Sequence, residues 1–88
     1  MPIVSMFYGI VIEIHTETND RHHTPHIHAR YQDERVVVSL DGEVLAGSIR
    51  KDKLRMIQAW IIIHHDELVA DWEIASAGEK VFRIEPLK

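Results

Sequence analysis

Four of the seven histidines lie close together in the segment His22-His23-Thr24-Pro25-His26-Ile27-His28. Pro25 biases the residue before it towards an extended backbone, which predicts that a strand begins near His26. His26 and His28 are two residues apart, and side chains at this spacing on a strand point to the same face. We therefore expect both imidazoles on one solvent-accessible face, with His22 close by.

A metal site would need more than His26 and His28, because a lone pair of histidines is a weak motif. A third ligand would come from His22 or His23, or from His15 if the first two strands pair. A set of imidazoles suits zinc, nickel, copper or iron. The pattern thus predicts a divalent transition metal such as zinc, with binding that weakens below about pH 6 because a ligating imidazole must be neutral.

The same histidines could also act without a metal. A histidine titrates near neutral pH and can serve as general acid or base on a ribose hydroxyl or a leaving oxygen, and an arginine can hold a phosphate. This hypothesis gives a catalytic set of His22, His26, His28, Arg30 and Tyr31. The alternative is structural, with the imidazoles packed on a half-exposed sheet face and hydrogen-bonded locally.

A second group of polar residues, His64, Glu67 and Asp71, follows helical spacing. Residues three, four and seven apart share one side of a helix. A hydrogen-bonded structural cluster or an interface is favoured here over a metal site. Trp60 and Trp72 fall on the apolar side of the same helix, so we expect core packing rather than a platform for stacked bases.

The elements that position these residues are strands in the first half of the chain and a helix in the second. Short polar turns separate the strands, which is typical of an antiparallel meander. The predicted fold is α+β, with a three- to four-stranded meander over residues 6–47. The expected strands are Met6–Ile14, His26–Tyr31, Arg35–Leu40 and Glu43–Gly47. In the first of them, Tyr8 and the isoleucines that follow it form the predicted core face.

One long helix is predicted over residues 51–77, ending at Gly78. Its apolar arc is wider than the roughly 100° that packing on one sheet requires. We therefore predict an interface, in a homo-oligomer or with a partner protein, formed by Met56, Trp60, Ile63 and Ile74. The competing account is that residues 80–87 fold back and cover this stripe. Within the C-terminal segment 79–88, residues 79–86 could form a short final edge strand.

Composition limits the classes of function. A chain of 88 residues is one domain, residues 1–88. Its 14 acidic and 10 basic residues give a net charge of −4, which argues against broad nucleic-acid binding but leaves room for a small RNA-cleaving site. The absence of cysteine fits the cytoplasm. No signal peptide is expected, and no stretch approaches the roughly 20 apolar residues of a membrane span.

Several motifs together resemble the small bacterial proteins of domain-of-unknown-function family 4160. They are the segment Pro2–Ile12, the residues His22, Pro25–Ala29 and Tyr31, and in the second half Trp60, Glu67-Leu68, Trp72-Glu73, Ala77-Gly78 and Ile84–Leu87. The chain departs from the family pattern at Thr24, where the family usually has a further proline, and at Asp71, where asparagine is frequent.

The resemblance implies a role in a two-gene module, beside a second small protein encoded by the adjacent gene. It thus implies a component of a type II toxin–antitoxin-like pair that acts by partner binding. We lean towards the toxin, because the chain shows neither a DNA-binding motif nor a disordered tail. The alternatives from the residues themselves are a small histidine- or metal-dependent phosphodiesterase acting on RNA, and a non-catalytic metal-binding module.

Overall fold

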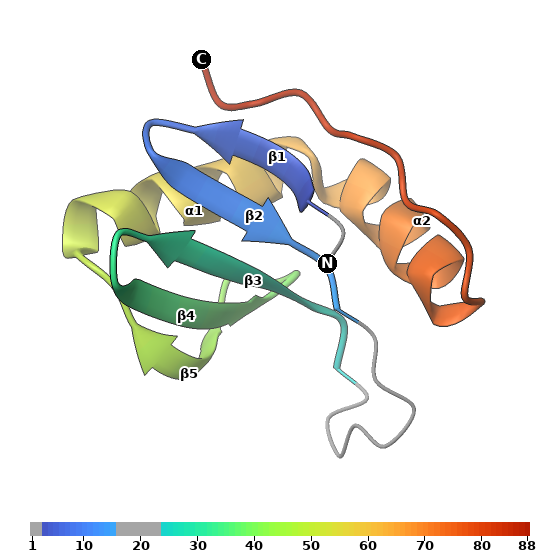
Figure 1. Ribbon diagram of the computed structural model, residues 1–88, viewed down its shortest axis with the longest axis horizontal. Helices are drawn as coiled ribbons and strands as arrows, with labels where there is room; N and C mark the ends of the chain where they lie inside the picture. Colours follow the sequence, from blue (N-terminus) through green and yellow to red (C-terminus); the bar gives the residue numbers. More distant parts are fainter. Residues whose placement is uncertain (1–2, 16–23) are drawn as a thin grey trace.

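The computed structural model describes residues 3–15 and 24–88. In these residues five strands form one antiparallel sheet in the order β1-β2-β3-β4-β5, and two helices follow (Figure 1). The elements are β1 (Ile3–Phe7), β2 (Ile10–Glu13), β3 (His26–Tyr31), β4 (Glu34–Ser39), β5 (Val44–Ser48), α1 (Lys51–Ile63) and α2 (His65–Ser76). The α+β meander is confirmed, while the expected strand number was too low.

The first predicted strand is in fact a hairpin. The chain turns at Tyr8 and Gly9, which have φ values of 50° and 80°, and β1 returns as β2 with Phe7 opposite Ile10. A side chain at position 9 would also crowd Tyr31, since an added Cβ would lie 3.0 Å from its Cε1. The prediction of one strand over residues 6–14 is therefore wrong. Tyr8 is exposed at the turn and does not share the core face of the isoleucines.

The predicted single helix is also wrong, because it is broken at His64. This residue has φ −111° and ψ 26°, outside helical values, and separates α1 from α2. Backbone hydrogen bonds continue through the break, from His64 N–H to the Trp60 carbonyl and from Leu68 N–H to the His64 carbonyl. The apolar pattern crosses the break without interruption, so hydrophobic periodicity gave no sign of it.

The core lies between one face of the sheet and the helices. Alternate residues of the strands supply Ile10, Ile12, Ile27, Val36 and Val38, all buried. From α1, Trp60 is 0% exposed, and its ring centroid lies 5.5 Å from that of Phe7. Figure 1 shows α1 running behind the sheet and α2 beside its right-hand end. Among the described helices, none is long and apolar enough to cross a membrane.

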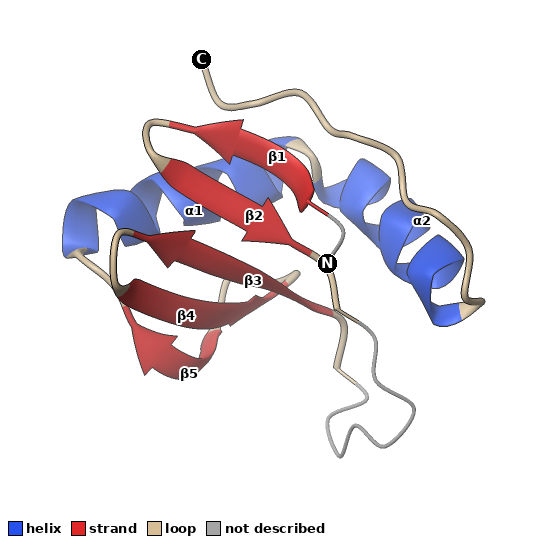
Figure 2. Cartoon of the chain, viewed as in Figure 1, coloured by secondary structure: helices blue, strands red, loops and turns tan. Residues whose placement is uncertain are grey.

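The C-terminal segment, residues 79–88, runs past α2 and along β1 without regular secondary structure (Figure 2). It is not the predicted edge strand, although Ile84 N–H donates to the Val4 carbonyl at 2.8 Å. The indole N–H of Trp60 donates to the Glu85 carbonyl at 2.8 Å. The segment thus folds back over the helix stripe at Trp60, as the competing account expected, but it leaves Ile63 exposed.

Candidate functional site

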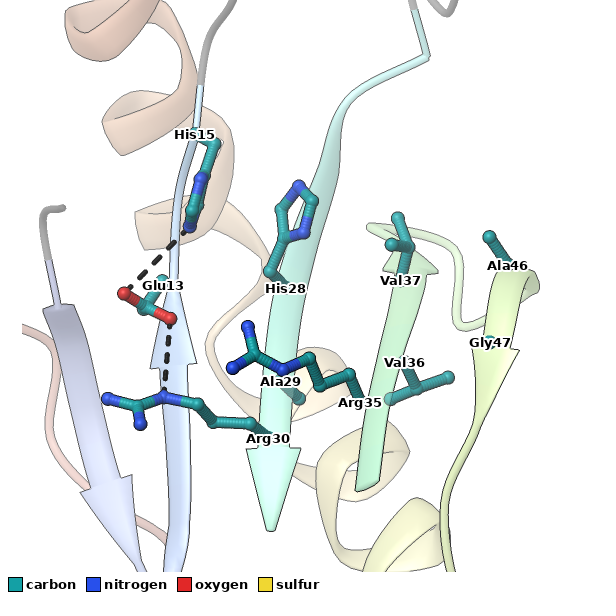
Figure 3. Close-up of a pocket in the computed structure, with 10 residues that line it drawn as sticks. All are labelled: Glu13, His15, His28, Ala29, Arg30, Arg35, Val36, Val37, Ala46 and Gly47. Carbon is teal, nitrogen blue, oxygen red and sulfur yellow. Dashed lines mark ion pairs between the residues drawn. The ribbon is translucent and has the colours of Figure 1, made fainter. Parts of the chain in front are cut away.

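Figure 3 shows a hollow with polar and apolar lining on the sheet face that α1 leaves uncovered. Its volume is about 240 Å³. Strand alternation explains its charged side chains, because residues between the buried core positions of β2, β3 and β4 point to this side. The lining residues are Glu13, His15, His28, Ala29, Arg30, Arg35, Val36, Val37, Ala46 and Gly47.

Glu13 lies at the centre of the charged groups and is only 7% exposed. Its Oε1 is 3.5 Å from Arg30 Nε, and its Oε2 is 3.9 Å from His15 Nε2. Burying a carboxylate costs free energy unless charged or hydrogen-bonding groups compensate it. Arg30 supplies that compensation from the neighbouring strand. The sequence analysis missed Glu13, which reads as an ordinary polar residue at the end of a strand.

His15 and His28 stack against each other at the mouth of the hollow, with ring centroids 4.2 Å apart. They meet because Glu13 is opposite His28 in the register of β2 and β3, which brings the chain just after β2 beside β3. Nε2 of His15 has no hydrogen-bond partner in the described part of the chain. The expectation that the first two predicted strands would bring His15 to the histidine pair agrees with this geometry.

His26 is on the same side as His28 but is buried. Their ring centroids are 5.2 Å apart, and the ring of Trp72 in α2 lies 5.0 Å from that of His26. His26 is 5% exposed, with Nδ1 2.7 Å from the Thr24 carbonyl oxygen. The expectation of a shared face agrees with the structure, whereas accessibility holds only for the half-buried His28. The bent helix pair, which the sequence did not reveal, places Trp72 over His26.

Two arginines line the hollow from adjacent strands. Arg30 of β3 and Arg35 of β4 are directly opposite in the register, so both point to the open face. Like charges directly opposite on a sheet are destabilising. The sequence-based prediction did not include Arg35. The tight turn after Tyr31 places Tyr31 opposite Glu34, so the next pair outward from the turn is Arg30 and Arg35.

Tyr31 does not join this group, because neighbouring residues on a strand point to opposite faces. Its ring lies under Lys53 of α1, whose Nζ is 4.7 Å from the ring centroid. Tyr31 is therefore on the helix side of the sheet, which argues against a catalytic role beside Arg30. His22 and His23 lie outside the described residues, so their predicted roles stay predictions.

A metal site was predicted from His15, His22, His26 and His28. Within residues 3–15 and 24–88, no three histidine, aspartate or glutamate side chains are gathered so that they could hold a metal ion. The version of the set with His15 as third ligand lies within these residues and is not gathered in this way, whereas the versions with His22 or His23 lie outside them. Metal binding through His22 or His23 is thus still a prediction.

The second predicted group, on the helices, divides into two separate pairs. His64 Nδ1 is 2.7 Å from Glu67 Oε1. Asp71 instead accepts a hydrogen bond from Phe82 N–H at 3.1 Å and is only 3% exposed. Burial raises the pKa of the Asp71 carboxyl, and the nearby Glu67 adds to the increase, while the Phe82 hydrogen bond opposes it. Both pairs are structural contacts, as favoured from the sequence.

The four predicted interface residues have different surroundings. Trp60 is buried in the core of its own chain, which contradicts its assignment to an interface between chains. Met56 and Ile74 are half-buried. Ile63 is 64% exposed and lies beside Ile62, which is 76% exposed. The C-terminal segment accounts for the difference, because it covers the helix stripe at Trp60.

Fold and site together define a class of small α+β proteins in which a meander exposes a histidine- and arginine-lined sheet face. The family model described as Domain of unknown function (DUF4160) matches residues 9–73, most of the chain. The chain therefore belongs to this family, as its motifs indicated. No curated protein matches the chain. No solved structure matches it either.

Proposed function

We propose that the hollow binds RNA and cleaves its phosphodiester bonds by histidine acid–base catalysis. The observation that carries the proposal is the cross-strand pair of Arg30 and Arg35. Two guanidinium groups on one face repel each other, and Glu13 forms an ion pair with Arg30, its Oε1 lying 3.5 Å from Arg30 Nε. A phosphate between them would remove the repulsion and accept hydrogen bonds from both.

The stacked imidazoles of His15 and His28 would supply the proton transfers. One neutral imidazole takes the proton from the ribose 2′-hydroxyl, whose oxygen attacks the adjacent phosphorus. The bond from phosphorus to the 5′-oxygen breaks, and the second, protonated imidazole gives its proton to that oxygen. The products are a 2′,3′-cyclic phosphate and a free 5′-hydroxyl. Glu13, 3.9 Å from His15 Nε2, positions that ring.

The test is cleavage of a single-stranded RNA oligonucleotide by the purified chain, with chelator present. His15→Ala and His28→Ala should each lower the rate at least 100-fold, since positioned acid–base groups contribute about 10²–10⁴-fold. Arg35→Gln should mainly weaken binding, whereas Arg55→Gln, on the exposed side of α1, should change neither. Cleavage that survives both histidine substitutions would exclude the mechanism.

A second proposal, a toxin–antitoxin-type component that acts by binding the adjacent gene's product, is favoured by the two exposed isoleucines at the end of α1. Ile62 and Ile63 are 76% and 64% exposed, and a partner that covers them would gain about 1.5–3 kcal/mol for each side chain. Co-expression tests it directly. The two proteins should co-purify, and Ile63→Glu should release the partner while leaving RNA cleavage intact. A partner retained by Ile63→Glu would contradict this surface.

A further inference from the structure

The two edge strands of the sheet, β1 and β5, differ in whether another segment of the chain lies along them. The β1 edge is followed by the C-terminal segment, which donates from Ile84 N–H to the Val4 carbonyl. β5 pairs with β4 on one side and forms the other edge. All five of its residues are exposed. In Figure 1 no other described element runs along its outer side.

The β5 edge lacks most of the features that discourage pairing with another chain. Such edges usually carry lysine, proline or inward-pointing charge, but Val44-Leu45-Ala46-Gly47-Ser48 is uncharged and contains no proline. One protecting feature is present, because the register with β4 shifts between Val37 and Val38 and leaves Leu45 without a partner. Such a bulge increases local twist, so any strand pairing here should be weak.

The residues that flank β5 indicate the partner. Asp41 and Glu43 precede the strand, and Arg50 and Lys51 follow it; all four are exposed. Arg50 already pairs with Asp52, its Nε 3.0 Å from Oδ1, so Lys51 supplies the net positive charge of residues 50–52. A second copy of β5 in antiparallel orientation would bring the acidic flank of each chain next to the basic flank of the other. Parallel pairing would instead oppose like charges. Opposite charges across an interface fix register and suppress other arrangements.

We propose that β5 pairs with β5 of a second copy in antiparallel orientation, so that two sheets join into one. A two-fold axis perpendicular to the sheet keeps the open faces of both copies on the same side. Ala46 and Gly47 of β5 also line the hollow, so the two hollows would lie on either side of the new strand pair. The joined face would then carry Arg30 and Arg35 from each copy. This surface is distinct from the helix stripe.

The experiment is sedimentation velocity at low ionic strength with charge-exchanged variants. A five-residue strand pair is smaller than a standard interface, so we expect a weak dimer with a dissociation constant on the order of 100 μM. Glu43→Lys and Lys51→Glu should each weaken the dimer several-fold, since each introduces two repulsive contacts of about 0.2–1 kcal/mol. An equimolar mixture of the two variants should recover the dimer, because each then faces opposite charge.

Matched controls are Glu79→Lys and Lys80→Glu, which make the same charge changes at exposed positions after α2. They should leave the dimer unchanged, alone and mixed. A wild-type chain that is monomeric at 500 μM would overturn the proposal. So would a dimer that neither flank variant weakens, or a mixture that associates no better than its components. The RNA-cleavage proposal has its own readout, since monomeric variants retain Arg30, Arg35 and both histidines.

Discussion

The two faces of the sheet are built from alternate residues of the same strands, yet only the face towards α1 can be predicted from the sequence pattern. The face towards α1 is apolar, and its positions follow from alternation along each strand, as with Ile27 in β3. The open face gathers Glu13, His15, His28 and two arginines. Which of these meet depends on the register between strands, and sequence alternation does not contain that information.

The largest expected effect comes from the core face, with Trp60→Ala. Truncation of a buried tryptophan typically costs about 3–5 kcal/mol in the free energy of unfolding. Here it also leaves the Glu85 carbonyl without its indole donor. We expect a loss in this range by urea denaturation. His28→Ala on the open face should cost less than half as much; equal losses would contradict the distinction between the faces.

Gly47→Ala should have the second largest effect on the free energy of unfolding. Gly47 belongs to the edge strand β5 and also lines the hollow. Its φ is +76°, and an added Cβ would lie 2.4 Å from the Arg35 carbonyl oxygen. Gly42 has φ +89° with nothing within 4 Å of such a Cβ. Left-handed backbone alone costs a non-glycine residue about 1–2 kcal/mol. Gly42→Ala should show that cost by urea denaturation, and Gly47→Ala clearly more. Equal losses would mean that the close approach to β4 is not rigid.

Particular residues show which features of the fold and the candidate site could be predicted from the sequence. The meander, the helical second half and the shared side of His26 and His28 followed from pattern and spacing. The turn at Tyr8-Gly9 was hidden because alternation of apolar residues continues through it. The break at His64 was hidden because both helices keep the same apolar period. Arg35 and Glu13 were missed because their roles arise from cross-strand neighbours, which a single chain segment does not reveal.

The third expected effect concerns the open face, with Arg35→Gln. Removing one of two like charges that are directly opposite should stabilise the fold by about 0.2–1 kcal/mol, whereas most substitutions destabilise. Affinity for RNA should fall in the same variant. Urea denaturation should show the gain in the free energy of unfolding, and fluorescence titration with RNA should show the loss of affinity. Arg55→Gln on α1 serves as control, and a destabilised Arg35→Gln would mean that the arginine serves the fold.

The smallest expected effect concerns Asp71, a buried polar group on the side of α2 that faces the C-terminal segment. Burial raises the pKa of its carboxyl above its usual value of 3.8, so the folded chain keeps this proton at a pH where the unfolded chain has lost it. Its contribution to stability is therefore greatest below pH 3.8, falls as pH rises through the raised pKa, and is constant above that value.

Asp71→Asn should remove this pH dependence while its amide oxygen still accepts from Phe82 N–H. The new amide N–H₂ needs a partner at a position where Asp71 Oδ2 has none among the described residues. At pH 7 the gain from removing a buried charge is opposed by the unpaired buried donor, which costs about 1–3 kcal/mol. The informative measurement is the difference in unfolding free energy between variant and wild type from pH 3 to 7. It should shift in favour of asparagine as pH rises. A difference that is flat with pH would mean that the Asp71 carboxyl ionises in the folded chain as it does in the unfolded one.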